Sequence, residues 1–256
     1  MINQNDYNQI SKHLKYDVNL ILKDKVTSTN DVIKEMADNT DNFTVLSVNE
    51  QTKGKGRMGR SFYSPDNSGI YMSILLKDNL KVKDSLLLTV KSAVAVAKAI
   101  EKLSGAVPQI KWVNDIYING KKVCGILTEG RVSKNNIDLD YAIVGIGVNI
   151  TPIKNIPDEI KNIAGSVFEE DINVKNEMIA EIINQFFCVL NRDVLKDYRS
   201  YLMLKDKTVE VINSKGNYLA KVIDVDNDFQ LIVENDKGER LVLNSGEVRI
   251  KNYEKN

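Results

Sequence analysis

A short run of alternating glycines and cations carries the strongest chemical signal in the sequence. Residues 51–60 read QTKGKGRMGR, in which glycines at 54, 56 and 59 alternate with Lys55, Arg57 and Arg60. Glycine allows backbone conformations in which amides approach an anion closely, and arginine adds forked donors for phosphate or carboxylate. The segment therefore fits a clamp that holds a nucleotide phosphate beside a carboxylate. Its spacing matches neither a Walker loop nor a dinucleotide fingerprint, and a flexible basic surface loop is the alternative.

Two further segments have residue types that suit a nucleotide site. Residues 111–115 read KWVND, and Lys122 follows shortly before Gly125. Lysine, asparagine and aspartate at a strand end can contact ATP and its magnesium ion. Two ordinary strands with a polar hairpin explain the same residues, and Trp112 equally fits a core aromatic. Residues 144–149, VGIGVN, place glycines inside a strand, where either a ligand or a packed backbone comes close.

Helices and strands must position these segments. Residues 28–31 (STND) predict a helix start with hydroxyl caps, and residues 85–103 predict a helix that ends at Gly105. Asn119-Gly120 predicts a tight hairpin turn. Strands are predicted at 43–49, 69–77, 109–112, 115–118, 123–129 and 141–150, and further helices at 176–190 and 192–203.

The two ends of the chain differ from this central part. Residues 1–25 are expected to be a polar lead-in, with at most a short helix or strand near residues 16–22. After Leu204, short alternating segments separated by turn residues predict the strands of a small β-barrel: 208–212, 218–225, 229–233, 240–243 and 247–250. We therefore predict an α+β fold in two domains. A mixed β-sheet with helices packed against it forms residues 1–204, and the small C-terminal barrel forms residues 205–256.

Composition disfavours several classes of protein. The 256 residues are 43% hydrophobic and 27% charged, which is typical of a globular protein. Lys+Arg and Asp+Glu both number 35, and a net charge of zero argues against a protein that coats nucleic acid. Cys124 and Cys188 form no disulfide or zinc pattern, and His13, the one histidine, disfavours His-rich metal sites and a Ser-His-Asp triad. Without a visible signal peptide or spanning segment, we expect a cytoplasmic protein with no membrane or nucleic-acid partner.

Taken together and in order, the motifs resemble those of the biotin protein ligase family. The matching elements are Ser28-Thr29-Asn30, the glycine-rich segment with Gln51, residues 111–129, residues 144–149 and Gly246-Glu247-Val248. The resemblance extends over roughly residues 25–250. Lipoate ligases and octanoyl transferases share the fold but look less similar in the basic segment.

The resemblance implies a fold, an activity and partners. The main domain would be a catalytic domain like that of class II synthetases, and the enzyme would be a biotin–[biotin carboxyl-carrier protein] ligase. It would use ATP and Mg²⁺ to activate biotin to biotinyl-5'-AMP, and would transfer biotin to a lysine of the biotin carrier domain of a carboxylase. A lipoate-protein ligase is the alternative. The family includes monomers and homodimers.

The resemblance also assigns roles to individual residues. The expected biotin-binding residues are Ser28, Thr29, Asn30 and Gln51 at the ureido end, with Lys55, Gly56, Arg57, Lys122 and Gly125 along the rest of the ligand. The expected ATP-binding residues are Arg57, Arg60, Lys111, Asn114, Asp115 and Asn149. Lys122, Arg57 and Asp115 are expected to be catalytic. Asp115 would also bind the metal and face the acceptor lysine.

Three positions depart from the family pattern, and one domain is expected to be absent. Lys55 and Met58 stand where arginine is usual, and Val113 replaces proline. Lys55 keeps its charge but loses the fork, so a weaker contact is expected there. Only 27 residues precede Ser28, too few for the helix-turn-helix domain of some members, so a ligase without a repressor role is expected.

Overall fold

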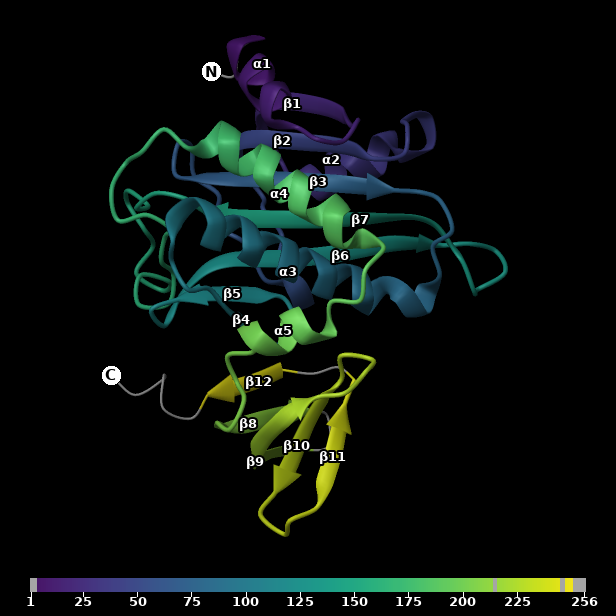
Figure 1. The fold of residues 1–256 in the computed structure, drawn as a ribbon, viewed down its shortest axis with the longest axis vertical. Coiled ribbons are helices and arrows are strands. Elements are labelled where there is room, and N and C mark those ends of the chain that lie inside the picture. The colour runs from purple at the N-terminus through teal and green to yellow at the C-terminus, as the bar shows by residue number, and fades with distance from the viewer. Residues whose placement is uncertain (1–3, 214–215, 245–246, 251–256) are drawn as a thin grey trace.

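The computed structural model describes residues 4–213, 216–244 and 247–250. Its main part is a seven-stranded mixed sheet with helices on both faces, and a five-stranded sheet follows at the C-terminus (Figure 1). The predicted α+β fold with a mixed sheet is confirmed. In the described part of the chain, no helix is both long enough and apolar enough to cross a membrane.

The large sheet has the strand order β1-β2-β3-β7-β6-β5-β4. Strands β1 and β2 pair in parallel, and the other neighbours pair antiparallel. The strands are β1 (Asn19–Val26), β2 (Thr44–Gln51), β3 (Gly69–Leu76), β4 (Gln109–Lys111), β5 (Asp115–Ile118), β6 (Lys121–Val132) and β7 (Leu139–Asn149). Of the helix or strand expected near residues 16–22, the strand is present as the edge strand β1, and a helix that was not predicted precedes it.

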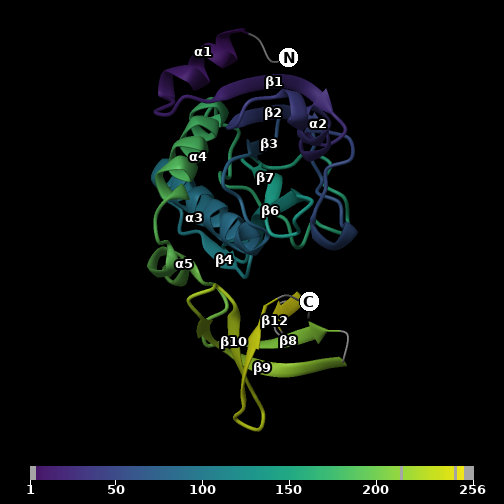
Figure 2. The same cartoon turned by 90° about the vertical axis from the view of Figure 1, so that its right-hand side faces the viewer.

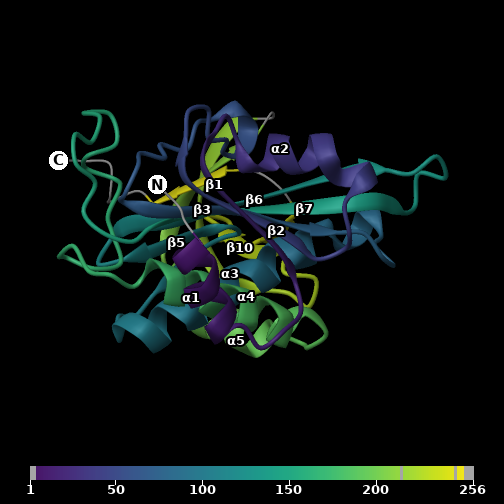
Figure 3. The same ribbon diagram turned by 90° about the horizontal axis from the view of Figure 1, so that it is seen from above.

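Helices cover the two faces of this sheet unequally. One face packs against α3 (Ser85–Ser104) and α4 (Lys175–Leu190), with α1 (Gln4–His13) beside α4. The other face carries α2 (Thr29–Met36), which lies alone opposite them in Figures 2 and 3. The uncovered part of that second face is where side chains from loops can reach the sheet.

The sequence pattern explains why the central strands are buried on both sides. Every residue of β3, GIYMSILL, is buried, so alternate side chains enter a core under α3 and α4 and a second core under α2. Helix α3 ends at Gly105, whose φ of 68° is left-handed as the predicted cap requires. Asn119 and Gly120 both have positive φ, so the β5–β6 hairpin turn is confirmed.

The C-terminal sheet has the order β11-β10-β9-β8-β12, with all neighbours antiparallel. Its strands follow α5 (Leu195–Tyr201) and are β8 (Thr208–Asn213), β9 (Gly216–Val225), β10 (Leu231–Asn235), β11 (Arg240–Leu243) and β12 (Glu247–Ile250). The five predicted strands are present. Among the described residues β11 and β12 are not paired, so closure into a barrel is not confirmed. The domain division at residue 205 stays a prediction.

Trp112 connects the two sheets. Its ring is buried, and its indole Nε1 donates a hydrogen bond to the Phe229 carbonyl at 2.9 Å. The Phe229 ring in turn packs edge-to-face on Tyr198 at 5.6 Å between centroids. Trp112 is therefore a core aromatic, which was one of the alternatives for this residue. It anchors the C-terminal sheet to the segment that holds Lys111 and Asn114.

We predict that Trp112→Phe lowers the free energy of unfolding by about 1–3 kcal/mol, because the buried Phe229 carbonyl loses its donor and water does not replace it. Urea unfolding followed by circular dichroism measures the change. Val107→Ala is the control, since Val107 is 75% exposed and its loss should change stability by less than about 0.5 kcal/mol. A Trp112→Phe protein as stable as that control would contradict the anchoring role.

Candidate functional site

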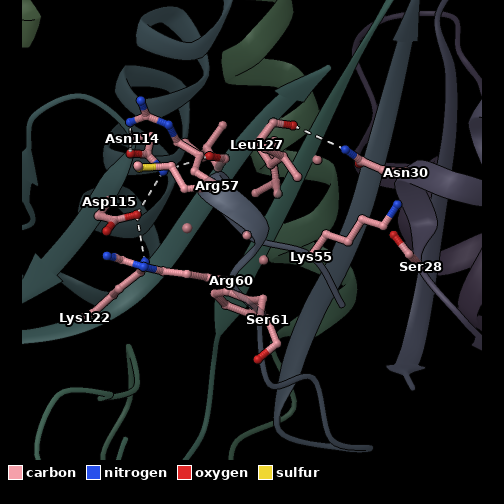
Figure 4. A pocket seen from close by; sticks show the side chains of 18 of the residues that line it. Ser28, Asn30, Lys55, Arg57, Arg60, Ser61, Asn114, Asp115, Lys122 and Leu127 are labelled. Carbon is pink, nitrogen blue, oxygen red and sulfur yellow. Dashed lines mark hydrogen bonds and ion pairs between the residues drawn. The ribbon is translucent and has the colours of Figure 1, made fainter. Parts of the chain in front are cut away.

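A single pocket on the α2 side of the large sheet brings together nearly all of the residues singled out from the sequence. It lies over β6 and β7, between the start of α2, the glycine-rich segment and the β5–β6 hairpin (Figure 4). The expected residues that line it are Ser28, Thr29, Asn30, Gln51, Lys55, Gly56, Arg57, Arg60, Lys111, Asn114, Asp115, Lys122 and Gly125.

Glycines make the floor of this pocket. A Cβ at Gly145 would lie 2.3 Å from Asn30 Oδ1, and one at Gly147 would lie 2.6 Å from Phe62 Cε1. A Cβ at Gly125 would lie 3.2 Å from the same Phe62 ring. Bare backbone is therefore required for Asn30 and Phe62 to lie against the strands. The glycines of VGIGVN are explained by this close approach of two side chains that both line the pocket.

One end of the pocket is a network of neutral polar groups around Thr29. The Thr29 amide donates to Gln51 Oε1 at 2.8 Å, and the Thr29 hydroxyl lies 3.1 Å from the same oxygen. Gln51 Nε2 donates to Ser64 Oγ at 2.9 Å, which fixes the orientation of the amide. Ser28 is buried at the N-cap of α2, but its hydroxyl makes no cap hydrogen bond, so the expected hydroxyl cap is wrong.

Asn30 is held from both sides within the same network. Its Nδ2 donates to Glu129 Oε2 at 2.6 Å, and Ser73 Oγ donates to its Oδ1 at 2.7 Å. Ser73 Oγ also lies 2.7 Å from the Thr29 hydroxyl. Since Thr29, Asn30 and Ser73 are buried and held by these hydrogen bonds, they form a pre-organised polar surface at this end of the pocket.

The other end of the pocket is charged. Arg57 Nη1 donates to Asn114 Oδ1 at 2.9 Å, and Asn114 Nδ2 donates to Asp115 Oδ1 at 3.0 Å. Lys122 Nζ forms an ion pair with the same carboxylate oxygen at 2.8 Å. Figure 4 shows this chain running from the glycine-rich segment across β5 to β6. The side chains of Asp115 and Lys122 are only 24% and 28% exposed, so the pair is partly shielded from water.

The glycine-rich segment folds back on itself. The Gly56 amide donates to the Arg60 carbonyl at 2.7 Å, and the Phe62 amide donates to the Gly54 carbonyl at 2.9 Å. The turn passes through Met58, which has a φ of 57° and is 75% exposed. The segment is therefore a hydrogen-bonded strap over the pocket.

Lys55 makes an ion pair with Asp31 at the start of α2. The hydrogen bond that Lys55 donates to the Asp31 carboxylate raises the pKa of the Lys55 ammonium, because it favours the charged form. Lys55 lines the pocket as a full positive charge. Lys55 lacks the bidentate guanidinium of the arginine that is usual at this position, but it provides the same positive charge.

Asn149 is the one expected residue that does not line the pocket. It lies at the end of β7, where Nδ2 donates to the Gly165 carbonyl at 2.9 Å. Its Oδ1 is buried, and no hydrogen-bond partner for it exists among the residues described. The strand has passed the pocket by this position, so the ATP contact of Asn149 stays a prediction.

Sequence analysis missed several residues of the site. Phe62 lines the pocket, while Ser73 and Glu129 support Asn30 from behind. Val248, which belongs to the matching motif but was given no role, also lines the pocket. A hydroxyl in the otherwise apolar segment of residues 69–77 was the available signal for Ser73. Gly246, expected from its motif, lies outside the described residues.

Comparisons with known proteins agree with this arrangement. Residues 22–149 match the Biotin/lipoate A/B protein ligase family. The bifunctional ligase/repressor BirA of Bacillus subtilis is 31% identical over 233 residues, which are 86% of this chain and 70% of that protein. The chain belongs to the biotin/lipoate A/B protein ligase family.

Within this family, the chain is similar to biotin protein ligases in both structure and sequence. The biotin protein ligase of Aquifex aeolicus in complex with biotin and ATP has 27% sequence identity and a TM-score of 0.76. The match covers 91% of this chain and 98% of that one. The biotin–[acetyl-CoA-carboxylase] ligase of Mycobacterium tuberculosis is 24% identical over 236 residues, 86% of this chain and 85% of that protein. The resemblance to biotin protein ligases is confirmed.

We predict that Gly145→Ala destabilises the protein by about 1–3 kcal/mol, because the new methyl group displaces Asn30 from its buried hydrogen bonds. Equilibrium urea unfolding provides the measurement. Gly56→Ala is the matched control, since its Cβ would have no heavy atom closer than 3.4 Å and its φ of −120° suits alanine. If both variants unfold at the same urea concentration, the position of Asn30 does not require a residue without a Cβ at 145.

Proposed function

We propose that this protein joins biotin to ATP as biotinyl-5'-AMP and then transfers the biotinyl group to a lysine of the biotin carrier domain of a carboxylase. The observation that carries the proposal is a pocket with a neutral polar end, a glycine floor and a cationic end. Biotin has a ureido group at one end and a carboxylate at the other. The complex of the Aquifex aeolicus relative with biotin and ATP supports the same assignment.

The ureido group would lie at the polar end. It presents one carbonyl acceptor and two N–H donors, and the hydroxyls and amides of Ser28, Thr29, Asn30 and Gln51 offer both kinds of partner. Their mutual hydrogen bonds hold them in place before the ligand arrives, which lowers the entropy lost on binding. Lipoate has no ureido group, so this polar end favours biotin over the lipoate alternative.

The carboxylate would lie at the cationic end. A carboxylate is already ionised at neutral pH, so its attack on the α-phosphate of ATP needs no base. Repulsion between the two anions is the barrier, and Lys122 and Arg57 lie where they would offset it. Lys55, Arg60 and Lys111 also line the pocket and would add to this positive field.

The donor set also fits a magnesium ion. In the described part of the chain, no group of three or more His, Cys, Asp or Glu side chains could hold a metal ion without a ligand. Magnesium commonly uses one or two carboxylates together with substrate phosphates, so Asp115 with the Asn114 amide oxygen would suffice once ATP is present. The ion would supply charge neutralisation for the phosphates.

Transfer would then need a base for the acceptor lysine. Its amine attacks the carbonyl carbon of the adenylate, a C–N bond forms, the C–O bond to AMP breaks, and one proton leaves the nitrogen. Asp115 is our candidate to receive that proton. In the ligand-free protein Asp115 is paired with Lys122, so recruitment of Lys122 to the substrate would release the carboxylate for this task.

The C-terminal sheet would cover part of the nucleotide side. Val248 of β12 lines the pocket, and Trp112 connects the pocket wall to Phe229 of the same sheet. We assign residues 1–204 to the catalytic domain and residues 205–256 to this smaller unit.

The decisive experiment is a pyrophosphate-release assay with biotin, ATP and a biotin carrier domain. Release that requires biotin, followed by incorporation of labelled biotin into the carrier domain, supports the proposal. A parallel reaction with lipoate tests the alternative activity. A binding module without catalysis would release no pyrophosphate with either acid.

Lys122→Ala should reduce the rate of biotin-dependent pyrophosphate release by about 10²–10³-fold, because it removes a donor to charge that develops in the transition state. Lys121→Ala is the control: its neighbouring ammonium donates to the Asn162 carbonyl and lies outside the pocket lining. Circular dichroism checks that both variants are folded. Adenylate formation at the wild-type rate in Lys122→Ala would remove Lys122 from the mechanism.

Arg57→Gly should release the adenylate into solution, because the strap loses its bond to Asn114 and no longer shields the anhydride from solvent. Biotinylation of an added non-carrier protein, such as serum albumin, measures the leak. The control is Lys53→Ala, which removes an exposed cation outside the pocket. Equal labelling of albumin by the wild type and Arg57→Gly would exclude retention by this strap.

A further inference from the structure

A second cavity of about 200 Å³ lies away from the biotin pocket, between strands β2 and β3 and the starts of α1 and α4. Figure 1 shows α1 and α4 side by side over this end of the sheet. Among the residues that line it are Ser47, Asn173, Lys175 and Asn176. None of these residues lines the pocket described above or has a part in the proposed reaction.

Ser47 presents its hydroxyl to this cavity. The residue is 3% exposed, and in the described part of the chain its Oγ makes no hydrogen bond. It lies between Leu46 and Val48 on β2, both of which pack under α2, so Ser47 faces the opposite side of the sheet. The hydroxyl lines the cavity and is not tied up by a protein partner, so a ligand in the cavity can accept a hydrogen bond from it.

The start of α4 adds unbonded amides beside this hydroxyl. Val174 occupies the N-cap and has no side-chain acceptor. The amides of Lys175, Asn176 and Glu177 therefore have no capping partner, and within the described residues nothing else accepts from them. The helix runs for 16 residues, so its N-terminus carries the partial positive charge that attracts anions.

Lys175 brings a full positive charge to the same place. Burial lowers the pKa of its ammonium, while Asp66 and Asp171 act in the opposite direction from a distance. No carboxylate lies within ion-pair distance of Lys175 in the part of the chain described. Asp6 also lines the cavity, but it accepts a hydrogen bond from Asn176 Nδ2 at 3.1 Å. A partly buried ammonium without a counter-ion favours binding of an anion.

We propose that this cavity is a binding site for a compact oxyanion, either a small carboxylate or a phosphate. The Lys175 ammonium, the Ser47 hydroxyl and the first amides of α4 would hold its oxygens. Because Asp6 lies at the same cavity, a small ion of low charge fits better than a polyphosphate. The site is separate from the biotin pocket, so its ligand would bind with or without biotin.

The test measures the reactivity of Lys175 itself. The full-length protein is acylated with a water-soluble succinimidyl ester, with inorganic phosphate or acetate titrated against chloride at constant ionic strength. Mass spectrometry of peptides gives the rate at each lysine. Lys34, exposed on α2 at the other face of the sheet, is the internal control.

Saturating phosphate or acetate should slow acylation of Lys175 by about ten-fold or more and leave Lys34 unchanged. The ion with the lower midpoint identifies which oxyanion the cavity prefers. Ser47→Ala should raise that midpoint by at least about ten-fold, since a hydrogen bond to a charged ligand is lost.

Because the Ser47 hydroxyl has no protein partner, Ser47→Ala should unfold at the same urea concentration as the wild type or at a higher one. This separates loss of the ligand from loss of the fold. Equal slowing of Lys175 and Lys34, no slowing with either ion, or an unchanged midpoint in Ser47→Ala would each overturn the proposal.

Discussion

The site depends on glycines in the two strands that form the floor of the pocket. At Gly125, Gly145 and Gly147, Asn30 or the Phe62 ring occupies the space that a Cβ would need. This steric constraint sets the depth of the pocket, the position of the α2 start and the path of the segment that carries Phe62. The glycine-rich segment supplies charge, but the glycines of β6 and β7 determine where Phe62, just after that segment, can lie.

Charge in the site is balanced internally before any ligand binds. Asp115 offsets Lys122, and Asn114 links that pair to Arg57. A ligand carboxylate or phosphate must therefore compete with a protein carboxylate for the same ammonium. Such competition discriminates between ligands. Only an anion that also contacts Arg57 and the polar end of the pocket offsets the free energy lost when the Lys122–Asp115 ion pair is broken.

Sequence reasoning recovered the elements that local rules determine. The helix over residues 85–103 and the hairpin at Asn119-Gly120 follow from short patterns, and the site motifs were close enough to a known family to be assigned. Edge strand β1 was left within the polar lead-in, since only one of its residues is fully buried and its pairing with β2 is non-local. Ser73 and Glu129 were missed for a similar reason: pairing of β3, β7 and β6 brings them to Asn30.

The hydrogen bond between Trp112 and Phe229 makes the C-terminal sheet part of the energetics of the site. Trp112 itself lines the pocket, so a displacement of the small sheet is transmitted to the turn between β4 and β5, which presents Asn114 to Arg57. A protein that docks on the small sheet and shifts it would change the affinity of the pocket for small ligands. Because such coupling is reciprocal, the ligands would change the affinity for the docked protein by the same factor.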